Sequence, residues 1–173
     1  VAKIRKIEDK VDILCAGLTD YAIRLSGLQI SEKEHQLVSR MLQVITDMER
    51  ICDYCENVSE FAETMGEKNI DFSEEAHRQL NEMINTCAAS FHYALDALEN
   101  SSAESALRTI EKETEADTME ISMRSQHIKR LVNGDCNAEA GMVYLDAVIS
   151  MERISDHARN IAEEVLEEKG IKK

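Results

Sequence analysis

The sequence predicts an all-α protein built from antiparallel helix bundles. Its 173 residues contain no proline and only 6 glycines, so long helices can run without interruption. Aromatic residues make up 4% of the chain, which argues against a β-sandwich or barrel. Apolar residues also recur every three or four positions along several segments, which is the spacing of one buried helix face.

Local signals at helix ends predict five long helices joined by short connections. Ser31 followed by Glu34 is a capping-box pattern. Ser73 and Asn137 are N-cap residues, and Gly134 follows a helix end. The expected helices cover residues 2–25, 31–65, 73–99, 102–132 and 137–170. Short connections between long helices make sequence neighbours antiparallel in a bundle.

Two of the expected helices repeat each other. The segment MERICDYCENVSE at 48–60 aligns with MERISDHARNIAE at 151–163, at an offset of 152 − 49 = 103. Seven of the thirteen positions are identical, which indicates an internal repeat. A weaker echo at an offset of 105 relates EDKVD at 8–12 to ETEAD at 113–117. Pairing Glu8 with Glu111 instead is an open alternative.

The repeat predicts two units of unequal size. If the unit is three helices, residues 1–66 form an incomplete first unit of two helices and residues 73–170 form a complete second unit. The incomplete unit would then expose an apolar groove where a third helix is missing. We expect a second copy of the chain to cover this groove, so that the chain forms a homodimer in isolation.

Charge and composition exclude several classes of function. The formal net charge is -14, which repels nucleic acid and anionic lipid surfaces. The longest uncharged run, 84–95, is too short to span a bilayer. The 5 cysteines show no disulfide framework, which favours a reducing compartment. No Ser-His-Asp order or glycine-rich phosphate loop is recognisable, so we expect no enzymatic activity.

Acidic pairs at positions i and i+4 are the candidate metal ligands. Four residues of helix place two side chains about 40° apart and about 6 Å along the axis. The repeated segments carry four such pairs: Glu8 and Asp12, Glu49 and Asp53, Glu113 and Asp117, Glu152 and Asp156. Two pairs on adjacent helices need a neutralising cation, and carboxylates suit iron, manganese, magnesium or calcium.

A plainer interpretation competes with metal binding. Asp and Glu make up 34 of the 173 residues, so acidic pairs on solvated helix faces arise by chance. Arg50 and Arg153, which also repeat, can pair with nearby acids. On that interpretation the chain is a metal-free helical adaptor.

The segments ERICD and ERISD, each continuing to Asn and Glu, resemble the ERIGD-type helix of the PhoU family. EDKVD and ETEAD resemble the acidic stretch of its middle helix, and the resemblance covers almost the whole chain. It implies tandem three-helix bundles that regulate phosphate transport and phosphate signalling, with a phosphate transporter or signalling protein as partner. Cys52 and Ser155 depart from the family, which often has glycine there.

The resemblance also implies two sites for iron or zinc clusters, with manganese or magnesium as other candidates. The first site would use Glu8, Asp12, Glu49 and Asp53, and the second Glu113, Asp117, Glu152 and Asp156. PhoU-like domains also form the cytosolic C-terminal part of sodium/phosphate cotransporter-like proteins. The chain begins in the middle of a helical pattern, so we expect a cytoplasmic domain of such an inner-membrane protein.

Three further motifs have a functional and a structural interpretation. Cys52 and Cys55 form a CxxC, but the repeat matches them to Ser155 and Ala158, which predicts small core residues. Two ExxH patterns, ending at His35 and His77, would suit a diiron-carboxylate oxidoreductase, but both lie in the first turn of a helix. His157, beside Asp156, is a further candidate ligand of the second site.

Overall fold

The computed structural model describes residues 1–171, which fold into helices without any strand. The helices are α1 (Ala2–Ser26), α2 (Glu32–Lys68), α3 (Glu74–Asn100), α4 (Ala103–Asn133) and α5 (Ala138–Glu168). The all-α class and the five-helix order predicted from the sequence are therefore confirmed. None of these helices has a stretch that is long and apolar enough to cross a lipid bilayer.

The helix ends follow the capping signals. The Ser31 hydroxyl accepts a hydrogen bond from the Glu34 amide, and the Glu34 carboxylate accepts one from the Ser31 amide at 2.7 Å. The Ser73 side chain accepts a hydrogen bond from the Ala76 amide, and the Asn137 side chain accepts one from the Ala140 amide, which caps α3 and α5. Gly134 ends α4 with φ +78°, a left-handed conformation that suits glycine. The observed helix ends lie within three residues of the expected ones.

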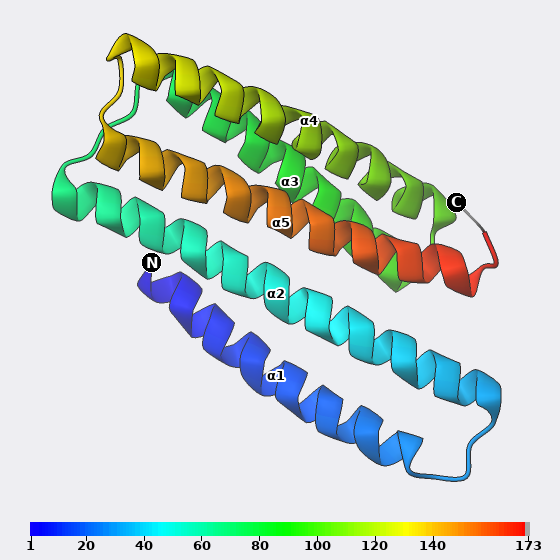
Figure 1. The fold of residues 1–173 in the computed structure, drawn as a ribbon. Helices are drawn as coiled ribbons and strands as arrows, with labels where there is room; N and C mark the ends of the chain where they lie inside the picture. Colours follow the sequence, from blue (N-terminus) through cyan, green and yellow to red (C-terminus); the bar gives the residue numbers. More distant parts are fainter. Residues whose placement is uncertain (172–173) are drawn as a thin grey trace.

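The five helices pack as a three-helix bundle with two further helices on one side. α3, α4 and α5 all contact one another, α2 packs on α5, and α1 contacts only α2 among the helices of residues 1–171. Figure 1 shows α1, α2 and α5 following one another across the molecule, each antiparallel to the next. α4 is antiparallel to both α3 and α5.

The main hydrophobic core surrounds α5. It contains Met83 and Cys87 of α3 together with Val148, Met151 and Ile161 of α5, all nearly or fully buried. The Cys87 thiol donates to the Met151 carbonyl at 3.2 Å. α5 contributes more buried side chains than any other helix because three helices cover it.

The two repeated helices, α2 and α5, pack against each other across a local two-fold axis. Tyr54 of α2 and His157 of α5 occupy equivalent positions of the repeat, at the offset of 103. Their rings stack with centroids 5.8 Å apart and an angle of 25° between the planes. Two antiparallel helices bring equivalent residues together in this way only near a two-fold axis. The sequence repeat is thus visible in the packing of α2 on α5.

Equivalent residues of the two units differ in exposure. Leu37 and Met41 of α2 are 45% and 38% exposed, while their counterparts Ala140 and Tyr144 of α5 are 3% and 1% exposed. α3 covers the second pair, and no helix of residues 1–171 covers the first in the same way. The exposed apolar groove predicted for the first unit is therefore confirmed.

The same difference corrects one prediction. Cys55 was expected in the core because its counterpart is Ala158, and that expectation is wrong. Ala158 is fully buried, whereas Cys55 is exposed and Cys52 is only half-buried. The physical reason is that α2 has two helical neighbours and α5 has three.

A buried carboxylate joins α2 to α5. Asp47 is 1% exposed. His157 Nδ1 lies 2.8 Å from Asp47 Oδ1, and the Asn160 amide donates to the same oxygen at 3.0 Å. The Gln43 amide donates to Asp47 Oδ2 at 3.0 Å. A buried carboxylate is tolerated only when its oxygens are satisfied, so this cluster specifies how the two helices fit.

We expect Asp47→Ala to destabilise the fold by about 1–3 kcal/mol, because it leaves buried polar groups of α5 without their acceptor. Urea unfolding followed by circular dichroism measures this loss. The matched control is Asp20→Ala, which removes an exposed partner of Arg24 on α1 and should change stability by less than about 0.5 kcal/mol. Equal effects of the two substitutions would contradict the structural role of Asp47.

Candidate metal centres

The first group of carboxylates lies between α1 and α2. Glu8 and Asp12 of α1 and Asp53 of α2 each offer an oxygen, and these atoms all lie within 4.8 Å of one another. The i, i+4 spacing puts the first two side chains on one face of α1, and α1 turns that face towards α2. The first predicted site is thus assembled with three of its four residues.

The second group lies between α4 and α5 and repeats this arrangement. Glu113 and Asp117 of α4 and Asp156 of α5 have carboxylate oxygens within 4.8 Å of one another. Glu113 is buried and takes the place that Glu8 has in the first group. Glu113, and not Glu111, joins the second group as Glu8 joins the first, which favours the offset of 105 over the pairing of Glu8 with Glu111.

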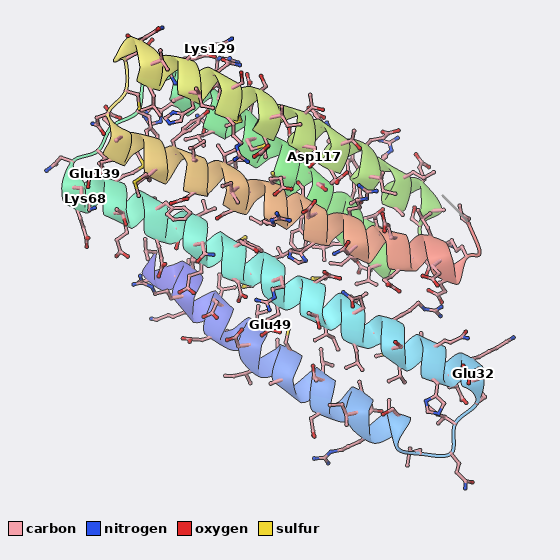
Figure 2. All side chains as sticks on the ribbon, in the orientation of Figure 1. Glu32, Glu49, Lys68, Asp117, Lys129 and Glu139 are labelled. Carbon is pink, nitrogen blue, oxygen red and sulfur yellow. The ribbon has the colours of Figure 1, made fainter. Side chains whose placement is uncertain are left out.

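Glu49 and Glu152 lie outside these two groups. Glu49 precedes Asp53, and Glu152 precedes Asp156, by about one helical turn. Glu49 is exposed, and Figure 2 shows it near the middle of α2. Glu152 lies close to Asp156; burial, and then the charge of that neighbour, raise the pKa of Glu152 to about 7. The structure therefore places these two glutamates beside the groups rather than within them.

The donor sets fit a hard cation. Metal–oxygen distances of about 2.0–2.6 Å allow ligand oxygens to lie up to about 5 Å apart across an ion, and both groups satisfy this limit. In the first group, burial, the hydrogen bond with Asp12 and the charge of Asp12 raise the pKa of Glu8. Burial is the largest cause, and a bound cation would relieve the part that comes from like charges.

Arginines already neutralise part of this charge. Arg50 Nη1 lies 3.4 Å from Asp53 Oδ2. Its repeat equivalent Arg153 lies 2.8 Å from Asp156 Oδ2 and 3.5 Å from a Glu152 oxygen. The plainer interpretation of the sequence, in which the repeated arginines pair with nearby acids, is therefore present alongside the carboxylate groups.

The two groups differ by one internal cation that the sequence analysis missed. Arg159 donates to buried Glu113 at 2.9 Å and to Glu163 at 2.7 Å. The equivalent residue of the first unit is Glu56, whose charge raises the pKa of Glu8 further. The signal was available, since Glu56 and Arg159 occupy one position of the repeat with opposite charges.

The other candidate ligands do not join either group. His35 is exposed, and His77 Nε2 lies 3.0 Å from Asp71. His157 is directed to Asp47 instead of the second group. Burial raises the pKa of Cys52 to about 11, which keeps its thiol protonated and unreactive at neutral pH. Neither the ExxH nor the CxxC motif therefore builds a centre within residues 1–171.

Comparison with known proteins gives consistent matches. The family model described as the PhoU domain matches residues 1–62 and 80–165. A phosphate-specific transport system accessory protein PhoU homolog of Thermotoga maritima is 28% identical over 151 residues, covering 80% of this chain and 64% of that protein. The phosphate-specific transport system accessory protein PhoU homolog of Deinococcus radiodurans is 21% identical over 166 residues. The match covers 95% of this chain and 76% of that protein. This chain thus spans less than two thirds of the length of the Thermotoga relative.

Two solved structures share the fold. PhoU from Pseudomonas aeruginosa matches with a TM-score of 0.84 and 22% identity, over 95% of this chain and 78% of that chain. The phosphate transport system regulatory protein PhoU from Streptococcus pneumoniae matches with a TM-score of 0.83 and 19% identity. The match covers 98% of this chain and 79% of that chain. At these identities the likeness concerns the arrangement of the helices.

The pKa of Glu152 predicts a pH-dependent stability in chelator-treated protein. A folded-state pKa of about 7, above the ordinary 4.5, stabilises the fold at low pH, and this contribution is lost as pH rises from 4.5 through 7. Glu152→Gln should therefore be more stable than the parent at pH 8, by about 1–2 kcal/mol once solvent screening of this partly exposed group is allowed for, and not at pH 4.5. Urea unfolding at both pH values measures this. Glu111→Gln is the exposed control, and a pH-independent difference for Glu152→Gln would contradict the assignment.

Proposed function

Because this chain belongs to the PhoU family, we propose that it is a regulatory domain that binds metal and controls phosphate transport or phosphate signalling. The family model spans all six carboxylates of the two groups. The curated relatives carry the name of accessory proteins of a phosphate-specific transport system. The observation that carries the metal proposal is that one three-carboxylate group is built twice, from equivalent residues of an internal repeat.

The metal in this proposal is iron, with zinc, manganese or magnesium as other occupants of the same carboxylates. It would be bound by Glu8, Asp12 and Asp53 in the first group. An ion held there would tie α1 to α2, since its ligands come from both helices. Such an ion would serve a structural or sensory purpose, because it would stiffen the pairing of α1 with α2.

The test is metal content by mass spectrometry, on protein purified without chelator or immobilised nickel and again after loading with iron, zinc or manganese. The parent should hold at least one ion per group. Asp12→Asn combined with Asp53→Asn should empty the first group, and Asp117→Asn combined with Asp156→Asn the second. Each pair should weaken binding more than about tenfold. The second group should bind less tightly, because Arg159 already occupies a Glu113 oxygen.

The matched control is Asp20→Asn combined with Asp146→Asn. Both residues are exposed, lie outside the two groups, and their replacement changes the net charge by the same amount. Metal loss in this control would point to non-specific acidic binding. Parent protein that takes up none of these ions would overturn the metal proposal and leave a metal-free helical adaptor, which the arginine pairs favour.

We further propose that the domain is attached to, or docks on, the membrane part of a sodium/phosphate cotransporter, and works on the cytoplasmic side. The motivation is membership of the PhoU family, since PhoU-like domains also form the cytosolic part of sodium/phosphate cotransporter-like proteins. Sequencing the gene upstream of the codon for Val1 tests the attachment. A coding region there without transmembrane helices would exclude it.

A homodimer is the proposed state of the isolated domain. Leu18 of α1 and Leu37, Met41 and Val44 of α2 line an open groove of about 270 Å³, and the first three are exposed. In the second unit α3 covers the equivalent surface of α5. A second copy can supply the missing helix face, because each copy carries the same apolar surface.

Sedimentation at micromolar concentration should show a dimer of the parent chain. Leu18→Glu should shift it to the monomer, because two charged side chains would enter an apolar interface. Ile128→Glu, an equal substitution at an exposed residue of α4, should leave the dimer intact. A monodisperse parent monomer, or equal dissociation by both variants, would contradict this assembly.

A further inference from the structure

The outer face of α4 carries an exposed apolar row towards its C-terminal end. Ile121, Ile128 and Val132 are 68%, 58% and 81% exposed. Their spacing of seven and four residues places the three side chains on one face of the helix, along about 16 Å of its axis. Figure 1 shows α4 at the edge of the molecule opposite α1. Among the helices of residues 1–171, α4 contacts only α3 and α5, so the row faces solvent.

The row borders an open hollow on the surface of α4. The hollow has a volume of about 490 Å³ and is lined by Glu120, Ile121, Arg124, Ser125, Ile128 and Lys129. Apolar residues spaced by seven and four positions form the seam along which two helices pack. A partner helix of about three turns is long enough to cover this row, so the shape suits a helix laid along α4.

The same stretch of α4 differs in charge from the rest of the chain. The net charge of the chain is -14, yet residues 121–134 contain three Lys and Arg residues and no acidic residue. Arg124 pairs with Glu120 at 2.7 Å. Lys129 is exposed and forms no ion pair with a carboxylate of residues 1–171, and Figure 2 shows it on the outer side of α4. The apolar row is therefore flanked by an unpaired positive charge.

The equivalent surface of the first unit lacks this unpaired charge. At the offset of 105, Lys129 corresponds to Arg24 and Ser125 corresponds to Asp20. Arg24 pairs with Asp20, four residues earlier on α1, at 2.8 Å. On α4 a serine takes the place of that acid, so the second unit leaves its cation free to pair with another molecule.

The apolar row is likewise specific to the second unit. Ile121 and Val132 correspond to Ala16 and Gly27 of the first unit, so neither has a large apolar equivalent. Single exposed apolar side chains are common on soluble proteins. A continuous row beside an unpaired cation is instead typical of an interaction surface. The second unit thus has both features, and it has them at the same place.

We propose that residues 121–132 of α4 dock a helical segment of another protein, whose apolar seam is flanked by carboxylates. The seam would pack along the row, and a carboxylate would pair with Lys129. A single row of apolar side chains suits a helix better than the plane of an anionic bilayer, which the net charge of -14 also repels. A second copy bound through the same face would bring Lys129 close to its own equivalent, and like charges disfavour that pairing.

This inference goes beyond the proposed function, because it names the chemistry of a partner and the surface that receives it. It rests on the proposed regulatory role only for the place of that partner in phosphate transport or signalling. The docking surface is tested on chelator-treated protein, so its failure and a failure of the metal proposal are separate results.

The experiment measures the binding of a fluorescent synthetic peptide by anisotropy. The peptide is a helix of about five turns, with leucines along one seam and glutamates on both sides of it. A second peptide has lysine in place of every glutamate. We expect saturable binding of the acidic peptide to the parent chain, at least about tenfold tighter than binding of the lysine peptide.

Two substitutions on α4 should each weaken binding of the acidic peptide at least about tenfold. Ile128→Ser removes apolar surface that the peptide would cover, and Lys129→Glu reverses the charge that faces the carboxylates. The matched controls are Ile23→Ser and Arg24→Glu at the equivalent positions of α1, where Ile23 is 57% exposed. Both controls should bind the peptide as the parent does.

Ser125→Asp is a third variant, which restores to α4 the acid that pairs with the cation in the first unit. It should weaken binding of the acidic peptide about two- to fivefold, because Lys129 then has a partner within its own helix. All three substitutions on α4 replace exposed side chains, and circular dichroism checks that the helices are retained.

Four results would overturn the proposal. The first is no saturable binding of the acidic peptide, and the second is equal binding of the lysine peptide. The third is a loss of binding in Leu18→Glu without a loss in Ile128→Ser, which would place the peptide in the apolar groove of the first unit. The fourth is binding of anionic phospholipid vesicles that Lys129→Glu abolishes, which would assign this face of α4 to a membrane.

Discussion

The antiparallel contact between α2 and α5 is the constraint on which the rest of the structure depends. No other pair of helices from the two units comes into close backbone contact within residues 1–171. At its centre the Asp47 carboxylate is enclosed and held by His157 and Asn160. A charge so deeply buried tolerates one register only, since a shift would leave its oxygens unsatisfied. The positions of α1 on one side and of α3 and α4 on the other follow from that register.

The repeat explains why two carboxylate groups exist, and its departures explain why they are unequal. α1 lies on α2 much as α4 lies on α5, so equivalent acids converge twice. In the second group Arg159 holds Glu113 as an internal counterion. In the first group Glu56 adds charge; Arg5 lies 3.6 Å from Glu56, and Arg50 lies 3.4 Å from Asp53. The chain itself therefore neutralises the second group more completely than the first.

The fold could be predicted from the sequence because its signals are local. The absence of proline, the caps such as Ser31 and Asn137, and the apolar spacing each act within a few residues, and the helix ends agree to within three residues. The carboxylate groups were predicted less completely. The i, i+4 spacing places Glu49 and Asp53 on one face of α2. Only Asp53 lies close enough to Glu8 and Asp12 of α1 to join the first group. That point is set by packing between distant segments, which no local spacing reports.

What the sequence analysis missed lies where the two units differ. A repeat draws attention to identical residues, yet here equivalent positions with different residues carry much of the chemistry. Tyr144 replaces the Met41 of the first unit, and around it the second unit gains a polar cavity with Arg130 and His127 in its wall. The incomplete unit keeps Met41 exposed in an apolar groove. Equivalent helix pairs thus border a polar cavity in one unit and an open apolar groove in the other, because only the second unit has α3 to enclose it.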